Sequence, residues 1–287
     1  MTITGRTTVA GVVGHPVRHS LSPVIHNAGF ASLGMDWVYG AFDLAPGAAS
    51  DGLAAMRALG IRGLSVTMPH KTEMARLVDE VSAAASRLES VNTLTLEDSG
   101  RIRGDSTDGD GLVSSLRVVD IDVAGRRVVL LGAGGAARSV LDSLLRHGVA
   151  RVDIVNRTAA AAERAAALDP QRCAVVDSTS VAEAVLAGEL VINATSVGMN
   201  RSPDDPAASP IEGDWLTADH VVVDLVYHPL ETALLRGAAQ RGCRTVDGLG
   251  MLIHQAALQQ QIWTGRFPDV GVMTAAARAA LVSPGPQ

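Results

Sequence analysis

The chain has 287 residues, of which 47% are hydrophobic and 19% are charged, and its formal net charge is −6. This length suits two domains, because one domain usually takes ~100–200 residues. The negative charge argues against a nucleic-acid binder, which usually carries a basic patch. No stretch reaches the ~18 apolar residues of a membrane span, and the first residues lack the apolar region of a signal peptide. We therefore expect a cytoplasmic protein that binds neither nucleic acid nor membranes.

In the first third of the chain, short apolar runs alternate with helical patterns. The pattern predicts strands over 8–14, 37–44 and 63–67, and helices over 23–33 and 48–59. Strands that alternate with helices are typical of a parallel α/β sheet. We therefore expect an α/β domain with a parallel sheet in this region.

The middle of the chain repeats this alternation. Strands are predicted over 127–131, 152–155, 174–176, 190–194, 221–225 and 244–246. Residues 250–281 are predicted to be helical, with a break at Gly271. The pattern predicts a Rossmann-type, parallel-sheet domain over 108–247 and a second α/β domain formed by 1–107 with 248–287. The binding site of such a chain is expected in the cleft between the two domains.

A glycine cluster follows the strand predicted at 127–131. The apolar run ends in Gly132-Ala-Gly134-Gly135, and an alanine-rich helical pattern comes next. A strand, a tight turn and a helix N-terminus in this order hold the pyrophosphate of a dinucleotide. Gly132 would permit the turn, Gly134 would let the backbone approach phosphate, and Ala137 would let helix and strand pack closely. The alternative is a plain strand-to-helix turn in which the glycines serve only the backbone.

The second strand of this domain ends in Asn156-Arg157-Thr158. An NAD site usually has a carboxylate here, bonded to the ribose 2′-hydroxyl. Asn156 does not repel a 2′-phosphate, and Arg157 can pair with one through charge-assisted hydrogen bonds. The sequence therefore favours NADP, although Ala161 supplies no second cation. The alternative makes Arg157 a solvated surface arginine.

Two segments of the first domain carry candidate substrate-binding residues. In Ser20-Leu-Ser22-Pro23, Pro23 suits the first helical position and Ser22 the N-cap. The two serine hydroxyls would then stand beside a positive helix end, which suits a small carboxylate. The alternative is an ordinary capped helix.

The second segment contains Thr67, Pro69 and Lys71. A strand is predicted to end at Thr67, and Pro69 would start a helix with Lys71 in its first turn. The helix dipole opposes a cation at this place. The placement would favour the neutral amine and help Lys71 exchange a proton with a substrate. Asp108, where the first domain passes into the second, could face Lys71. The alternative is an exposed lysine with no task.

Nine short motifs occur along the chain in the order of one known family. They are Ser20-x-Ser22-Pro23, Val66-Thr67-x-Pro69-x-Lys71, Val91-Asn92-Thr93, Thr107-Asp108-Gly109, Gly132-Ala-Gly134-Gly135-Ala136, Asn156-Arg157-Thr158, Asn193-Ala-Thr195-Ser196-x-Gly198-Met199, Val226-Tyr227-x-Pro229 and Gly248-Leu-Gly250-Met251-Leu-x-x-Gln255. Together they resemble the shikimate dehydrogenase family, and the resemblance extends from about residue 9 to Gly265.

The resemblance implies an oxidoreductase of aromatic amino acid (chorismate) biosynthesis that reversibly reduces 3-dehydroshikimate to shikimate with NADPH. It implies that Lys71 and Asp108 form the catalytic pair and that no metal is needed. By the same resemblance, the remaining substrate-binding residues are Ser20, Ser22, Thr67, Asn92, Tyr227 and Gln255. The cofactor-binding residues implied are Gly132, Gly134, Gly135, Ala136, Asn156, Arg157, Thr158, Thr195, Met199, Gly248 and Met251.

The chain departs from the family pattern at three positions. Ser106 stands where the family usually has asparagine, Ala161 where many members have a basic residue, and Gln260 where an aromatic is common. We also expect Cys173 and Cys243 to be reduced, buried thiols, because their spacing fits neither a zinc nor a redox motif. A metal site at His15 and His19 is not expected, and His70 is expected to be partly exposed.

Three other functions have to be weighed against this interpretation. A quinate/shikimate dehydrogenase with NAD preference is the nearest. A folate-linked methylene dehydrogenase is less compatible with an aromatic content of 3%. A non-catalytic NADP sensor would have no need of both Lys71 and Asp108. The sequence leaves the oligomeric state, monomer or homodimer, open.

Overall fold

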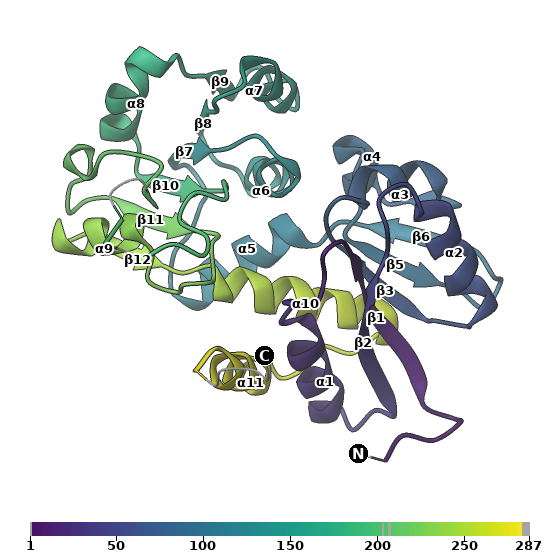
Figure 1. Cartoon of the computed structure of the whole chain (residues 1–287). Helices are drawn as coiled ribbons and strands as arrows, with labels where there is room; N and C mark the ends of the chain where they lie inside the picture. Colours follow the sequence, from purple (N-terminus) through teal and green to yellow (C-terminus); the bar gives the residue numbers. More distant parts are fainter. Residues whose placement is uncertain (1, 203, 206–207, 283–287) are drawn as a thin grey trace. The chain divides into compact units, whose positions relative to one another are not determined.

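The computed structural model describes residues 2–202, 204–205 and 208–282. The chain forms two compact units, residues 1–107 with 253–287 and residues 108–252 (Figure 1). It enters the second unit after Thr107 and returns to the first within helix α10 (Leu249–Thr264). The chain leaves the second unit after residue 252, a little later than the predicted domain boundary at residue 247. The reason is that Met251, in the first turn of α10, is part of the second unit's hydrophobic core.

In the described part of the chain, the first unit has a six-stranded sheet of order β2-β1-β3-β5-β6-β4. Its strands are β1 (Thr8–Gly14), β2 (Trp37–Asp43), β3 (Gly63–Val66), β4 (Glu80–Val81), β5 (Thr93–Leu96) and β6 (Ile102–Asp105). Strand β1 pairs in parallel with β2 and β3, but β5 is antiparallel to both β3 and β6. The prediction of a parallel sheet was therefore wrong for β5. A short turn joins β5 to β6, with the Glu97 N–H donating to Arg101 O at 2.9 Å, and a short turn forces antiparallel pairing.

Helices cover both faces of this sheet. They are α1 (Ser22–Ser32), α2 (Ala49–Ala58), α3 (Lys71–Leu77), α4 (Ala83–Leu88), α10 and α11 (Val270–Val282). One core cluster joins Met56 of α2 to Leu64 of β3. The other joins Phe30 of α1 to Val12 and Tyr39, and Trp263 of α10 packs against it.

The C-terminal helical segment breaks earlier than the sequence pattern predicts. Helix α10 ends at Thr264, and Gly265 follows with a φ of +71°. A left-handed residue ends a helix, and glycine adopts this conformation without a steric penalty. Gly271, the predicted break, lies inside α11 instead.

The second unit contains a parallel sheet of order β12-β11-β10-β7-β8-β9. Its strands are β7 (Arg127–Leu131), β8 (Arg151–Val155), β9 (Cys173–Val175), β10 (Leu190–Asn193), β11 (Val221–Asp224) and β12 (Arg244–Val246). This is the strand order of a doubly wound Rossmann sheet. Successive strands are added in one direction from β7 to β9 and in the opposite direction from β10 to β12, so the switch point lies between β7 and β10. Ligands of such sheets bind beyond the carboxyl ends of the strands at this switch point.

Alternating residues of each strand supply the two cores of this unit. Val128 and Leu130 pack with α5 (Asp108–Val118) and α6 (Gly135–Arg146), whereas Val129 and Leu131 pack with α8 (Val181–Ala187) and α9 (Ala233–Gln240). Helix α7 (Ala159–Ala166) follows β8. Apolar residues therefore run continuously along these strands, as expected where both faces of a sheet are covered.

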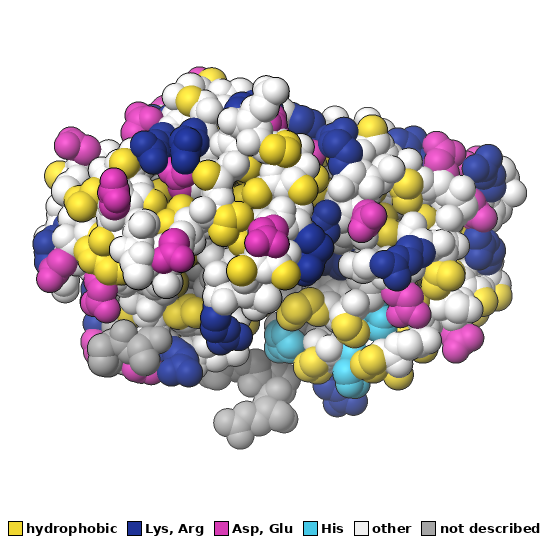
Figure 2. Space-filling model, turned by 90° about the horizontal axis from the view of Figure 1, so that it is seen from above, with side chains coloured by type: hydrophobic (Ala, Val, Ile, Leu, Met, Phe, Trp, Pro, Cys, Tyr) yellow, Lys and Arg dark blue, Asp and Glu magenta, His cyan; other side chains and the backbone are white. Residues whose placement is uncertain are grey.

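Several other expectations can be compared with the structure. Cys173 and Cys243 are buried free thiols, as predicted, and burial raises the pKa of Cys173 to about 11. Across the residues described, no helix has the length and apolar character needed to cross a membrane. On the face shown in Figure 2, acidic and basic side chains are interspersed.

Candidate functional site

In the first unit, the loops that follow β1 and β3 lie side by side. The Thr67 N–H donates to Val13 O, and the His15 N–H donates to Met68 O, both at 2.9 Å. The carboxyl ends of parallel strands meet at one edge of a sheet. The segment with Ser20 and the segment that leads to Lys71 therefore both leave the sheet at this edge.

Ser20 and Ser22 are half-buried at the start of α1. The prediction that Ser22 caps the helix was wrong, because α1 already begins at Ser22 and the preceding Leu21 makes no side-chain cap bond. Instead, the Ser20 Oγ accepts a hydrogen bond from the Ser22 N–H at 3.2 Å. The first turn of a helix has backbone N–H groups without partners, and Ser20 satisfies one of them.

Lys71 is the first residue of α3 and is half-buried. Pro69, predicted to start this helix, lies in the turn before it, and His70 takes the cap position. His70 is fully buried, contrary to the prediction of partial exposure. Its Nε2 donates to Leu44 O at 2.8 Å, and the Val91 N–H donates to Lys71 O at 3.1 Å. Both bonds fix the backbone at Lys71.

Asn92 forms a buried hydrogen-bonded frame with Thr107. The Asn92 Nδ2 donates to Thr107 Oγ1 at 3.0 Å, and its Oδ1 accepts from the Thr107 N–H at 2.8 Å and from Thr93 Oγ1 at 2.7 Å. The Thr107 hydroxyl donates to the backbone oxygen of Gln255 on α10 at 3.2 Å. The two predicted substrate-binding residues Asn92 and Gln255 are therefore joined through Thr107, which directly precedes Asp108.

Gln259 is a residue of this region that the sequence reasoning missed. Its Nε2 donates to Asn92 O at 3.0 Å, and its Oε1 accepts from Ser65 Oγ at 2.6 Å. The Tyr39 hydroxyl in turn donates to Ser65 Oγ at 2.6 Å. Residues four apart share one helix face, so the spacing from Gln255 to Gln259 was a usable signal.

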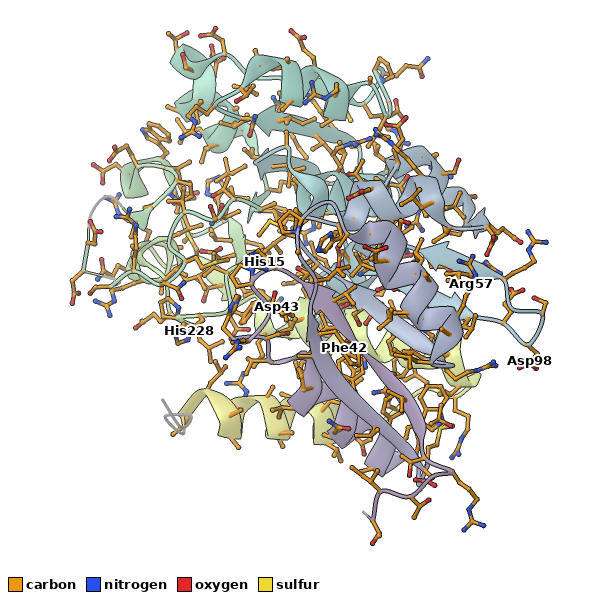
Figure 3. All side chains as sticks on the ribbon, turned by 45° about the vertical axis from the view of Figure 1, so that its right-hand side comes forward. His15, Phe42, Asp43, Arg57, Asp98 and His228 are labelled. Carbon is orange, nitrogen blue, oxygen red and sulfur yellow. The ribbon has the colours of Figure 1, made fainter. Side chains whose placement is uncertain are left out.

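His15, at the same sheet edge, is paired with a carboxylate. Its Nδ1 lies 2.7 Å from Asp43 Oδ1, and the two side chains point toward each other (Figure 3). Both are well exposed, at 47% and 41%. Among the described residues, no group of histidine, cysteine and acidic side chains is arranged to hold a metal ion.

In the second unit, the glycine cluster stands at the switch point of the sheet. Gly132 has a φ of +109°, and a Cβ there would lie 3.0 Å from Ala194 O in the loop after β10. The prediction that Gly132 permits the turn is therefore confirmed. Gly134 caps α6 and Gly135 starts it. A Cβ on either would meet no atom within 4 Å, so the chain itself does not demand glycine there.

The segment after β8 leads directly into α7. Thr158 is the cap residue of α7, and the Asn156 Nδ2 donates to its backbone oxygen at 2.9 Å. Arg157 is exposed. The Gly132 N–H donates to Val155 O at 2.8 Å, which joins this segment to the glycine cluster.

The other predicted cofactor residues follow β10, β11 and β12. Thr195 is half-buried, and its N–H and hydroxyl both donate to Asn193 Oδ1, at 3.0 and 2.7 Å. Gly248 is pressed against the chain, because a Cβ there would lie 2.3 Å from Leu225 O. Met199 is 44% exposed, whereas Met251 is 8% exposed and belongs to the hydrophobic core.

The remaining predicted residues are Ala136, which is half-buried in the first turn of α6, and Tyr227, which is half-buried after β11. Burial raises the pKa of the Tyr227 hydroxyl.

Within the first unit the structure joins the Ser20, Thr67 and Lys71 segments and joins Asn92 to Gln255. Lys71 belongs to the first unit and Asp108 begins the second.

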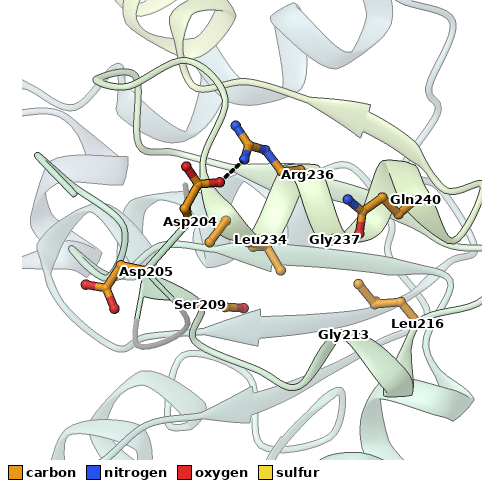
Figure 4. A pocket seen from close by; sticks show the side chains of 10 residues that line it. Asp204, Asp205, Ser209, Gly213, Leu216, Leu234, Arg236, Gly237 and Gln240 are labelled. Carbon is orange, nitrogen blue, oxygen red and sulfur yellow. Dashed lines mark hydrogen bonds and ion pairs between the residues drawn. The ribbon is translucent and has the colours of Figure 1, made fainter. Parts of the chain in front are cut away.

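A pocket of about 310 Å³ lies elsewhere in the second unit, beside α9 (Figure 4). Leu234 and Gln240 of α9 line it, and Arg236 forms ion pairs with Asp204 and Glu231. None of the predicted site residues lines this pocket.

A doubly wound parallel sheet with an open glycine turn at its switch point, joined to a second α/β unit, defines a two-unit nucleotide-binding α/β protein. Three family models match the chain: the shikimate dehydrogenase substrate binding domain over residues 12–94, shikimate / quinate 5-dehydrogenase over 115–203, and the shikimate 5′-dehydrogenase C-terminal domain over 248–278.

Full-length relatives agree with these matches. Shikimate dehydrogenase (NADP(+)) of Symbiobacterium thermophilum is 46% identical over 285 residues, with 96% of each chain covered. Shikimate 5-dehydrogenase from Thermus thermophilus, in complex with NADP(H) and shikimate, has a TM-score of 0.84 at 38% identity, covering 95% of this chain and 99% of that one. Quinate dehydrogenase from Corynebacterium glutamicum, in complex with NAD, has a TM-score of 0.85 at 32% identity, with the same coverage. The chain belongs to the shikimate dehydrogenase family.

Proposed function

We propose that this protein is an NADP-dependent shikimate dehydrogenase that reversibly reduces 3-dehydroshikimate to shikimate. The observation that carries the proposal is the open backbone at Gly134 and Gly135, at the switch point of the Rossmann sheet, in a chain of this family. A side chain at either glycine would stand in the open space beyond the N-terminus of α6. The unpaired N–H groups of that first turn suit a pyrophosphate.

The residues of the second unit fit NADP. Gly132, Gly134, Gly135 and Ala136 would hold the pyrophosphate by their backbone. Asn156, Arg157 and Thr158 would hold the 2′-phosphate, because an exposed guanidinium stands directly before the positive end of α7. This helix end offsets the missing basic residue at Ala161. Thr195, Met199, Gly248 and Met251 would border the nicotinamide and its ribose. When bound, the nicotinamide supplies the hydride.

The first unit would bind the substrate. Ser20 and Ser22, joined by Tyr227, would hold its carboxylate, and Thr67, Asn92 and Gln255 its ring hydroxyls. The frame around Asn92 supports this assignment. Because the bonds from Thr93 and Thr107 fix Oδ1, the orientation of the Asn92 amide is set before any substrate arrives.

Lys71 and Asp108 would form the catalytic pair. Reduction of a ketone builds negative charge on its oxygen, so a donor must supply a proton or stabilise the alkoxide. The Lys71 ammonium would donate this proton, and its amine would accept one in the reverse direction. Asp108 would be the partner of the Lys71 amine in this pair. The bond from the His70 ring to Leu44 O and the bond from the Val91 N–H to Lys71 O anchor the backbone from which the Lys71 side chain extends.

Initial rates with shikimate and quinate, each with NADP and NAD, test the proposal. We expect shikimate with NADP to give the highest kcat/KM. Highest activity with quinate and NAD would instead support the second candidate, which the likeness to a quinate dehydrogenase in complex with NAD favours. Cofactor binding without turnover would identify a sensor. We further propose a cytoplasmic location, and gel filtration would decide between monomer and homodimer.

A further inference from the structure

The last residues of β10 and β11 form a buried polar pair at the carboxyl edge of the second sheet. Asn193 and Asp224 are register partners in the parallel ladder, so their side chains point to the same face. Both are completely buried, and the Asn193 Nδ2 donates to Asp224 Oδ1 at 2.8 Å. The pair lies next to the switch point, because β10 also pairs with β7.

Asp224 has only neutral partners among the described residues. Its Oδ1 also accepts from the Val226 N–H at 3.0 Å, and its Oδ2 accepts from Thr232 Oγ1 at 2.7 Å. Burial raises the pKa of this carboxyl. Burying a carboxylate without a cation is costly, and buried polar groups of this kind can fix one arrangement of their surroundings.

One arm of the network runs to the loop after β10. Because Asp224 is an acceptor, the Asn193 amide must turn its Nδ2 toward it and its Oδ1 away from it. That orientation gives Thr195 its acceptor, at 2.7 Å from the hydroxyl. The Thr195 Oγ1 in turn accepts from the Val197 N–H at 3.1 Å, and the Asn193 Nδ2 donates to Val197 O at 3.2 Å. The carboxylate on one side and the Thr195 N–H on the other therefore hold the amide in the same orientation.

The other arm runs to the loop after β11. Asp224 accepts a hydrogen bond from the Val226 N–H, and the backbone oxygen of Val226 accepts one from the Gly248 N–H at 3.3 Å. Gly248 also lies close against this segment, because a Cβ there would lie 2.3 Å from Leu225 O. A further bond, from the Asn200 N–H to His228 O at 3.0 Å, ties the two loops together.

We propose that Asp224 is a positioning residue that anchors the Asn193 amide and the Val226 N–H. Through the amide it would place Thr195, and through Val226 it would place Tyr227 and Gly248, for the cofactor and substrate. The inference rests on the proposed function, which assigns those three residues to ligand binding. Thr232 is the third partner of Asp224, but it caps α9, with its Oγ1 accepting from the Leu235 N–H at 3.3 Å. The Thr232 bond therefore links Asp224 to the start of α9.

Four variants separate the bonds of Asp224 to the ligand loops from its bond to Thr232 on the helix side. Asp224→Val removes every acceptor, and Asn193→Ala removes the amide link if Asp224→Val does not fold. Thr232→Val removes only the helix-side bond, and Asp224→Asn can keep an oxygen toward Asn193 with its amide nitrogen toward Thr232. Each folded variant is measured for NADPH affinity by fluorescence titration, for kcat and KM, and for the primary deuterium isotope effect with NADPH deuterated at the transferred hydride.

We expect Asp224→Val and Asn193→Ala to lose about tenfold in NADPH affinity and in kcat, the effect of one or two misplaced contacts, and to show a larger isotope effect. Thr232→Val should lower Tm and leave NADPH affinity and the isotope effect unchanged. Asp224→Asn should have the parental NADPH affinity and isotope effect, unlike Asp224→Val. A merely structural role would lower Tm without moving the isotope effect.

Unchanged affinity and isotope effect in both Asp224→Val and Asn193→Ala would overturn the inference. So would equal kinetic damage in Thr232→Val, or an Asp224→Asn variant as impaired as Asp224→Val. A parental chain that binds NADPH but does not oxidise shikimate would refute the proposed function alone, because NADPH affinity still separates the variants.

Discussion

His26 makes the stability of the first unit depend on pH. It is completely buried in α1, and its ring stacks on Tyr39 with centroids 4.1 Å apart. The Gln260 Nε2 donates to its backbone oxygen at 2.8 Å and lies 3.2 Å from its Nδ1. Burial disfavours the charged ring and lowers the pKa of His26 to about 3. The folded chain therefore keeps His26 neutral at pH values where the unfolded chain protonates it.

The size of this effect follows from proton linkage. Below its ordinary pKa of 6.5, His26 binds a proton in the unfolded chain, whereas in the folded chain it does so only near pH 3. Each pH unit in this window lowers the free energy of unfolding by about 1.4 kcal/mol. Between pH 7 and pH 5 the loss is about 2 kcal/mol. Above pH 6.5 the group contributes no pH dependence, because both states are neutral.

Urea unfolding of the parental chain and of His26→Asn at pH 7 and pH 5 measures this loss. Asparagine keeps an acceptor near Gln260 but does not titrate, so the variant should lose about 2 kcal/mol less between the two pH values. Phe30→Leu is the control, because it weakens packing in the same cluster and keeps the histidine. Its pH dependence should match the parental one. An equal loss in His26→Asn and the parental chain would refute the reasoning.

Four further substitutions test other parts of the molecule, three of them at proposed ligand-binding residues. Gly248→Ala should cost about 3 kcal/mol of stability in thermal unfolding, because its Cβ would meet Leu225 O at 2.3 Å. Gly237→Ala, in α9 with open space around it, should instead gain about 1 kcal/mol. Lys71→Ala should lower kcat about a hundredfold or more with little change in KM for shikimate, and near-normal turnover would exclude Lys71 from the chemistry. Arg157→Ala should raise KM for NADP about tenfold but not KM for NAD.

Much of the fold could be predicted because its strands are buried on one or both faces. The predicted strands 8–14 and 127–131 agree with β1 and β7, which are buried over most of their length. Strand β4 has two residues and helix α4 has six, too few for either to show a period. Strands β5 and β6 were missed for another reason, because their hairpin contains no Asn-Gly or Asp-Gly turn.

The polar residues of the core were harder to predict than the motifs. Gln259 bonds to Asn92, 167 positions away in the chain. His70, next to Lys71 in sequence, was expected at the surface, yet its ring is buried against Leu44 O. Asp224 ends a run of valines and shows no motif of its own. Such residues are polar by composition and buried by tertiary packing. Helical spacing can place Gln259 on the face of Gln255, but the bonding partners of these residues are known only from the fold.

Gln260 shows how the structure accounts for a departure from the family pattern. An aromatic is common at this position, and the sequence alone offers no reason for an amide. In the structure Gln260 is fully buried, and a Cβ at Gly29 would lie 2.6 Å from its amide atoms. Gly29 therefore makes room for the amide, which reaches the backbone oxygen of His26 on the same helix. The glycine in α1 and the glutamine in α10 are thus parts of one packing arrangement around a neutral histidine.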